Sequence, residues 1–194
     1  MSLSFTPEGK LFHDFASILA DLTEDEFLES CTDHFLLQFP FTRMPPPKGS
    51  GVGDTRLTNR LEAQGAMIDA TMQLDLESVL AAAKGRKQAQ GARIHAIPVA
   101  TDTPLIIGRR SPADLVVPEQ TVSSKHAQIE LSEDRWTVVD LESQNGTYVD
   151  ARRIAPGDTV WFKPDSSLWF ASYRTIFLSP KKAYEIARKF GGKV

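Results

Sequence analysis

Residues 140–149 read Asp140-Leu141-Glu142-Ser143-Gln144-Asn145-Gly146-Thr147-Tyr148-Val149, and this stretch contributes most to the fold that we expect. Its Asn145-Gly146 pair is typical of a tight hairpin turn, because both residue types tolerate positive φ. Two earlier stretches accompany it, Ile106-Ile107-Gly108-Arg109 and Val122-Ser123-Ser124-Lys125-His126-Ala127. Each fragment alone is weak evidence for a particular fold, and the stronger evidence is the order and spacing of all three.

The surrounding sequence alternates short apolar stretches with turn residues such as Pro156-Gly157-Asp158. Many short strands with little helix between them predict a sandwich or barrel. Between residues 93 and 180 we therefore expect an all-β sandwich. Its predicted strands are 94–99, 104–109, 126–131, 135–141, 146–149, 159–162, 168–171 and 174–178.

Taken together, the three stretches resemble the signature of the forkhead-associated (FHA) family: Gly-Arg, then Ser-x-x-His, then Asn-Gly-Thr. The resemblance covers nearly half of the chain. It implies an FHA-like sandwich of two sheets that binds partner proteins and, in its active form, reads phosphothreonine. The chemistry agrees with this reading, since a phosphorylated side chain carries close to two negative charges and needs guanidinium, hydroxyl and amide donors.

The resemblance also implies a role for each matching residue. Arg109 and Ser123 would bind the phosphate, and Asn145 would hold the peptide backbone beside it. His126 would stabilise the binding loops through hydrogen bonds without touching the ligand. The expected phosphopeptide-binding residues are Arg109, Ser123, Ser124, Lys125, Gln144 and Asn145, and the expected structural loop residues are Gly108, His126, Gly146 and Thr147.

Three features depart from the family pattern. Ser124 stands where arginine or asparagine is frequent, and Gln144 stands where a shorter hydroxyl or a basic residue often adds a phosphate contact. Both changes would weaken binding or alter its selectivity. The first hairpin of the family is shortened here, so an edge strand is missing. We expect Phe35–Phe39 to fill that edge, because an open edge exposes unpaired backbone groups.

Outside the FHA-like region, 93–180, we expect three further segments. Residues 1–40 form a helical leader with that edge strand. Thr6-Pro7 is read as the start of its first helix, and Thr23 with Glu26 as the capping box of its second. Residues 41–92 read as a flexible linker with one short helix, because the linker is rich in proline and glycine. Residues 181–194 read as a C-terminal helix and tail, opened by Ser179-Pro180.

Composition narrows the classes of function. The formal net charge of −3 over 194 residues disfavours nucleic acid as the main partner. A lone cysteine and the lack of long apolar runs or a signal-like start predict a cytoplasmic protein without membrane contact. No spacing of histidines suits a metal, and no motif indicates a cofactor or an enzyme.

The sequence thus predicts a noncatalytic, phosphothreonine-dependent interaction module in serine/threonine kinase signalling. Its expected partner is a phosphothreonine-containing protein, either a kinase or a kinase substrate. Thr71 is a candidate phosphosite through which the chain would bind itself, with a helix-start threonine as the simpler reading. Two alternatives stay open: a phosphate-independent FHA scaffold, and nucleic-acid binding through the basic residues Lys181, Lys182, Arg188, Lys189 and Lys193.

Overall fold

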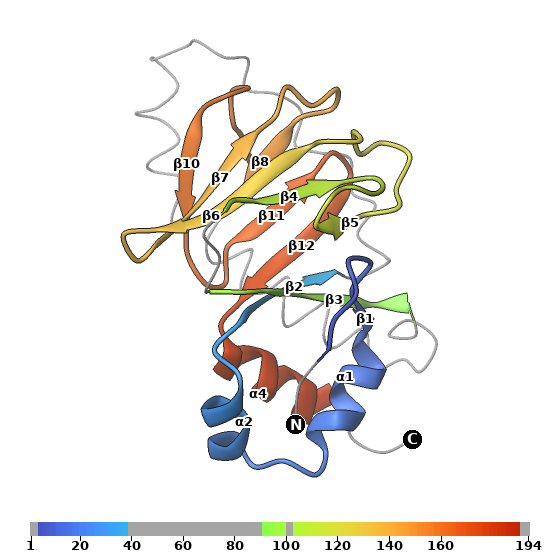
Figure 1. Cartoon of the computed structure of the whole chain (residues 1–194), viewed down its shortest axis with the longest axis vertical. Helices are drawn as coiled ribbons and strands as arrows, with labels where there is room; N and C mark the ends of the chain where they lie inside the picture. The colour runs from blue at the N-terminus through green and yellow to red at the C-terminus, as the bar shows by residue number, and fades with distance from the viewer. Residues whose placement is uncertain (1–3, 39–90, 100–102, 191–194) are drawn as a thin grey trace.

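A computed structural model describes residues 4–38, 91–99 and 103–190, which form two β-sheets and three helices (Figure 1). The first sheet has seven strands in the order β1 (Lys10–Leu11), β3 (Arg93–Ile97), β2 (His34–Gln38), β12 (Tyr173–Leu178), β11 (Ser167–Phe170), β8 (Thr147–Val149) and β9 (Arg152–Arg153). The second has five, β10 (Thr159–Phe162), β7 (Arg135–Asp140), β6 (Ala127–Ser132), β4 (Leu105–Gly108) and β5 (Leu115–Val116). All pairs within them are antiparallel except β4 with β5.

The two sheets enclose one hydrophobic core. Alternate residues of the strands point into it, as the two-residue period of a strand requires. Completely buried examples are Ile107 of β4, Ile129 of β6 and Phe177 of β12. The prediction of a two-sheet sandwich with added N-terminal and C-terminal helices is confirmed. The two-residue strands β1, β5 and β9 were not predicted, because so short a stretch carries no periodicity.

Strand β2 comes from the N-terminal segment, yet it lies inside the seven-stranded sheet. It pairs with β12 on one side, where Phe35 faces Leu178, and with β3 on the other, where Phe35 faces Ala96. The expectation that this strand would form an edge is therefore wrong. β3 and the short β1 lie beyond it, so β2 has both its rows of backbone groups paired within the sheet.

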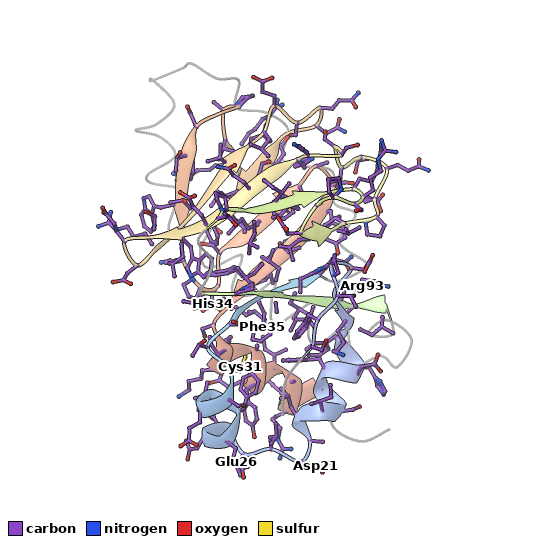
Figure 2. All side chains as sticks on the ribbon, viewed as in Figure 1. Asp21, Glu26, Cys31, His34, Phe35 and Arg93 are labelled. Atoms are coloured by element: carbon purple, nitrogen blue, oxygen red, sulfur yellow. The ribbon has the colours of Figure 1, made fainter. Side chains whose placement is uncertain are left out.

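The helices α1 (Phe12–Leu19), α2 (Glu24–Ser30) and α4 (Pro180–Phe190) pack together against the outer face of the β2 region (Figure 1). Figure 2 shows Cys31 and Phe35 in the space between this layer and the sheet. A second hydrophobic cluster fills that space, with Phe15, Phe27 and Phe35 completely buried at its centre. We call these three helices and their cluster the helical layer.

The helices begin partly where the sequence predicts. The capping box at α2 is present, since the Thr23 hydroxyl accepts from the Glu26 amide and the Glu26 carboxylate accepts from the Thr23 amide. The start of the first helix at Thr6-Pro7 is wrong. Thr6 and Gly9 instead close a turn, and Lys10 then pairs with Ile94, so α1 begins only at Phe12.

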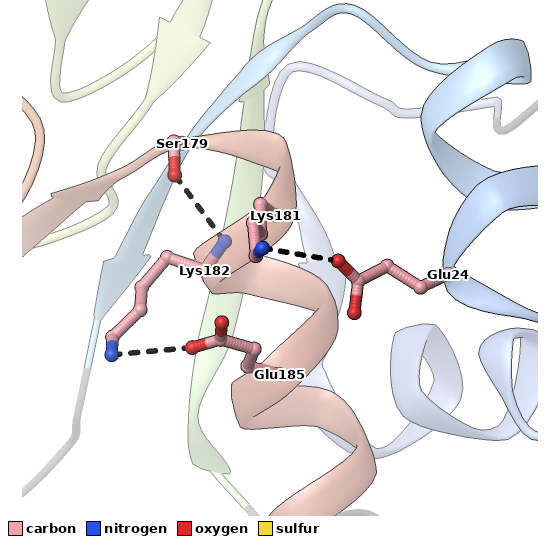
Figure 3. A network of polar contacts seen from close by, with 5 residues as sticks. All are labelled: Glu24, Ser179, Lys181, Lys182 and Glu185. Atoms are coloured by element: carbon pink, nitrogen blue, oxygen red, sulfur yellow. Dashed lines mark hydrogen bonds and ion pairs between the residues drawn. The ribbon is translucent and has the colours of Figure 1, made fainter.

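The C-terminal helix joins the leader through polar contacts as well as apolar ones. Figure 3 shows Lys181 of α4 paired with Glu24 of α2 at 3.4 Å. The Tyr184 hydroxyl and the Arg188 guanidinium donate to the carbonyls of Leu22 and Ala20, each at 2.8 Å. The exposed ion pair adds little stability, so the stacked rings of Phe27 and Tyr184 hold this contact more firmly.

Within the described ranges, no helix has the length and apolar character that crossing a lipid bilayer requires.

Candidate functional site

The site lies where three loops meet, after strands β4, β5 and β7. Arg109 directly follows β4, and its amide donates to the Ser123 carbonyl at 2.9 Å. Its guanidinium donates from Nη1 to the Gln120 carbonyl at 3.1 Å, and the side chain is only half-buried. A guanidinium has five N–H donors, so most of them stay available after this contact.

Gly108 allows two of these loops to approach each other closely. A Cβ atom at this position would overlap the backbone carbonyl of Ser124. Because the obstacle is backbone, no side-chain rotation could relieve the overlap. Gly108 therefore fixes the distance between the loop that carries Arg109 and the loop that carries Ser123, as expected of a structural loop residue.

His126 is completely buried and bridges the second loop to the third. Its Nδ1 accepts from the Ser123 amide at 3.0 Å, which leaves the proton on Nε2 to be donated to the Gly146 carbonyl at 3.2 Å. Burial lowers the pKa of His126, and the Gly146 carbonyl and the Asp140 carboxylate only partly oppose that shift. The neutral ring thus keeps one tautomer, and neither nitrogen is left for catalysis.

The third loop folds onto the buried carboxylate of Asp140. That carboxylate accepts from the amide and the hydroxyl of Ser143, at 2.8 and 2.6 Å, and from the Thr147 hydroxyl at 2.5 Å. The Ser143 hydroxyl in turn accepts from the Gly146 amide at 2.9 Å. These contacts hold residues 141–146 in one conformation, with Gly146 at a φ of +83°. Thr147 stabilises the loop here by binding Asp140.

Direct contacts join the remaining predicted residues. The Ser123 hydroxyl accepts from the Gln144 amide at 3.1 Å, and the Asn145 side chain donates from Nδ2 to the Thr121 carbonyl at 2.7 Å. The Thr121 hydroxyl also forms a hydrogen bond with that of Ser172, at 2.8 Å. The loops of Ser123 and Asn145 are therefore joined by these two hydrogen bonds as well as by the contact of His126 with Gly146.

The structure brings most of the predicted site residues to this one end of the sandwich. Hydrogen bonds connect the loops that carry Arg109, Ser123, Gln144 and Asn145. Ser124 and Lys125 lie in the same loop with exposed side chains. The candidate phosphosite Thr71 lies outside the described residues, as do the predicted linker and its helix.

Sequence reasoning missed several residues that shape the site. Asp140 and Ser143 organise the Asn145 loop, and Thr121 receives the Asn145 amide. The Asp-x-x-Ser spacing could have revealed the first pair, because short polar side chains often bind backbone groups a few residues away. No local signal marks Thr121, whose partners lie 24 and 51 residues further along the chain.

The polar side chains at the site are mainly hydrogen-bond donors. A half-buried guanidinium, a serine hydroxyl and an exposed asparagine amide lie on interlocked loops, with an exposed lysine nearby. Such a set suits an anion with several acceptor oxygens. A family comparison agrees with this picture, because residues 105–171 match the model of the family described as "FHA domain". Residues 105–171 are therefore similar to FHA domains.

Two curated relatives from Mycobacterium tuberculosis are similar to about half of this chain. The FHA domain-containing protein FhaB is 32% identical over 102 residues, which cover 53% of this chain and 62% of FhaB. The glycogen accumulation regulator GarA is 32% identical over 85 residues, which cover 44% of this chain and 51% of GarA. The chain therefore matches somewhat more than half the length of these relatives.

Solved FHA structures also resemble the chain. The FHA domain of the CT664 protein from Chlamydia trachomatis has a TM-score of 0.43 and 15% identity, and the match covers 75% of this chain and 97% of that one. EmbR from Mycobacterium tuberculosis, solved with a low-affinity phosphopeptide, has a TM-score of 0.40 and 24% identity, covering 45% of this chain and 22% of that one.

Proposed function

We propose that this protein is a noncatalytic adaptor that binds phosphothreonine-containing segments of partner proteins through the loop end of its FHA domain. The observation that carries the proposal is the interlocked set Arg109, Ser123 and Asn145, in which the guanidinium uses one donor on Gln120 and keeps the others. The partner is a serine/threonine kinase or a kinase substrate, met in the cytoplasm.

The charge and shape of a phosphate suit these donors. A phosphorylated side chain carries close to two negative charges and three strong acceptor oxygens. Arg109 supplies a planar fork that can bind two of those oxygens at once, and the exposed Lys125 adds positive charge on the neighbouring Ser123 loop. An unmodified threonine has neither the charge nor the acceptors, so this site would distinguish the two forms strongly.

The same loops argue for binding without catalysis. His126, the histidine of this end, is buried and uses both ring nitrogens to join two loops. Asp140 is likewise occupied by the Ser143 and Thr147 hydroxyls. Neither group can act as a general base on a bound ligand without releasing the loops it holds.

A titration with two matched peptide libraries tests the proposal, one containing phosphothreonine and the other threonine. We expect binding of the phosphorylated library alone, and a loss of about 100-fold in Arg109→Ala, because removing a charge-assisted hydrogen-bond partner costs about 2–3 kcal/mol. Arg110→Ala is the matched control, since this neighbouring arginine is exposed and should leave affinity within about twofold.

The opposite result would favour the scaffold reading. Equal, weak binding of both libraries, unchanged by Arg109→Ala, would mean that the fold docks partners without phosphate.

Nucleic-acid binding has less support than the adaptor function or the scaffold function, because basic residues of α4 already have partners: Lys181 pairs with Glu24, and Arg188 binds the Ala20 carbonyl.

Self-association through phosphorylated Thr71 is a separate proposal that rests on the sequence alone. Treatment with a threonine kinase followed by peptide mass analysis should place a phosphate between Arg60 and Lys84. The modified protein should then compete with phosphopeptides for Arg109. If no phosphate appears in that stretch, the proposal fails, and the adaptor function is unaffected.

A further inference from the structure

Arg153 lies beside the proposed phosphopeptide site but belongs to none of the three stretches that identify it. It is the second residue of β9 and pairs with Tyr148 of β8. Its side chain is exposed and runs against Gly146, so a Cβ atom on that glycine would lie 2.6 Å from Nε and 3.0 Å from Nη2 of the guanidinium. Gly146 leaves the space that the guanidinium occupies.

This contact places a positive charge next to the peptide-binding loop. Gly146 directly follows Asn145, and its carbonyl is the group that His126 binds. The Asp140 contacts fix this loop, so Asn145 keeps one position relative to the glycine against which the guanidinium lies. A peptide that runs past Asn145 would therefore meet Arg153 within one or two residues of its contact with the asparagine.

The charge of Arg153 is not neutralised by the described part of the chain. No hydrogen bond or ion pair joins the Arg153 side chain to another residue there. The carboxylate nearest to it in sequence is already used, since Asp150 accepts from the Ser167 amide at 2.8 Å and from the Ser166 hydroxyl at 3.0 Å. An exposed guanidinium without a carboxylate is well suited to accept one from a ligand.

We propose that Arg153 determines specificity, by binding the carboxylate of an aspartate or glutamate that flanks the phosphothreonine. This inference rests on the proposed function and adds a preference to it: the ligand is an acidic phosphopeptide. In this arrangement Arg109 and Ser123 bind the phosphate, and Arg153, which lies against the residue after Asn145, binds the second negative charge.

The neighbouring Arg152 provides a matched control. It is equally exposed and lies on the same two-residue strand. Successive strand residues point to opposite faces, and Arg152 pairs with Val149, whose side chain packs between the sheets, whereas Arg153 pairs with Tyr148 on the outer face. A substitution at either position removes one positive charge, but only Arg153 lies against Gly146.

The test measures affinity for phosphothreonine peptides in which each flanking position is glutamate or glutamine in turn. At one position wild type should bind the glutamate peptide about fivefold more tightly, the effect of a partly exposed ion pair. Arg153→Gln should bring that ratio to about one, Arg153→Lys should keep part of it, and Arg152→Gln should leave it as in wild type.

Two results would overturn the inference while leaving the proposed function intact. One is phosphopeptide binding with no preference for glutamate at any position. The other is a preference for glutamate that does not depend on Arg153, either because Arg153→Gln leaves it unchanged or because Arg152→Gln removes it equally. If no phosphopeptide binds at all, the adaptor function itself fails, and the specificity role of Arg153 fails with it. Circular dichroism confirms that each variant is folded.

Discussion

The two ends of this molecule are held together by different forces. At the loop end, buried polar groups such as His126 and Asp140 fix the binding loops through hydrogen bonds. At the other end, the helical layer is held by an aromatic cluster in which the rings of Phe15 and Phe35 lie 5.3 Å apart. Apolar burial supplies most folding free energy, while hydrogen bonds give loops a defined shape. We infer that the helical layer contributes to stability and not to binding, whereas the loops determine binding.

The largest effect should follow from Phe15→Ala in the helical layer. Phe15 is completely buried and contacts the rings of Phe27 and Phe35, so truncation leaves a cavity and should cost about 3–5 kcal/mol of unfolding free energy. Urea denaturation measures this loss. Phosphopeptide affinity of the folded protein should stay unchanged, because no site residue contacts Phe15.

The control for this experiment is His13→Ala on the same helix, since His13 is exposed. We expect it to change stability by less than about 0.5 kcal/mol. If Phe15→Ala left the urea midpoint of the sandwich where it was, the leader would not belong to its cooperative unit. That result would contradict our inference that the helical layer contributes to the stability of the fold.

The second prediction concerns His95 on β3, which is 2% exposed. Burial lowers its pKa from 6.5 to about 4; Arg93 adds to the decrease, and the Pro7 carbonyl and Glu8 partly oppose it. Between these two values the unfolded chain binds more protons than the folded protein, so stability is complete above pH 6.5 and falls as the pH decreases toward 4. The loss from this residue approaches about 3 kcal/mol.

Urea denaturation of wild type and His95→Gln across that pH range isolates the effect, because other titrating groups contribute equally to both proteins. Wild type should lose more stability than the variant as the pH falls. Parallel pH profiles for the two proteins would show that His95 is not held neutral by its surroundings.

A smaller effect on stability, now combined with an effect on binding, should follow from Thr147→Val. This nearly isosteric change removes the hydroxyl that donates to the buried Asp140 carboxylate, which costs about 2 kcal/mol. Because Asp140 also holds the Asn145 loop, phosphopeptide affinity should fall severalfold. Thr137→Val is the control, since the Thr137 hydroxyl makes only a 3.5 Å contact with the Glu130 carbonyl. Equal effects in both variants would argue against a special role of the Asp140 contacts.

The smallest effect is expected from Gln144→Ala. The Gln144 backbone amide, and not its side chain, donates to the Ser123 hydroxyl, and the side chain is exposed. Affinity for phosphopeptides should therefore change by no more than about twofold, as for other exposed substitutions. A tenfold loss of affinity in calorimetric titration would instead mean that the side-chain amide of Gln144 binds the ligand directly.

The sequence predicts the loop end better than the helical layer, for a physical reason. Gly108, Ser123 to His126, and Asn145 to Thr147 occur in short motifs whose local geometry depends on the residue types, such as the positive φ at Gly146, although Asn145-Gly146 does not close the tight hairpin that the pair predicts because β7 and β8 lie in different sheets. The structure adds partners from elsewhere in the chain, such as the Thr121 carbonyl for Asn145. No pattern along one loop reveals a contact with another.

The topology around the helical layer depends on contacts between segments that lie far apart in sequence. A strand near Phe35 follows from its apolar residues, but its place between β3 and β12 depends on which backbone groups remain unpaired in the assembled sheet. The start of α1 is similar. Thr6-Pro7 has local features of a helix start, yet pairing of Lys10 with Ile94 keeps Lys10 and Leu11 in a strand.

The central claim is that phosphothreonine is bound at the loop end, and amide chemical-shift mapping by NMR tests it most directly. On addition of a phosphothreonine peptide, we predict the largest shifts at Arg109, Ser123, Gln144 and Asn145, with little change in α2 and α4, and no shifts with the unphosphorylated peptide. Shifts centred on the helical layer, or identical shifts with both peptides, would contradict the account.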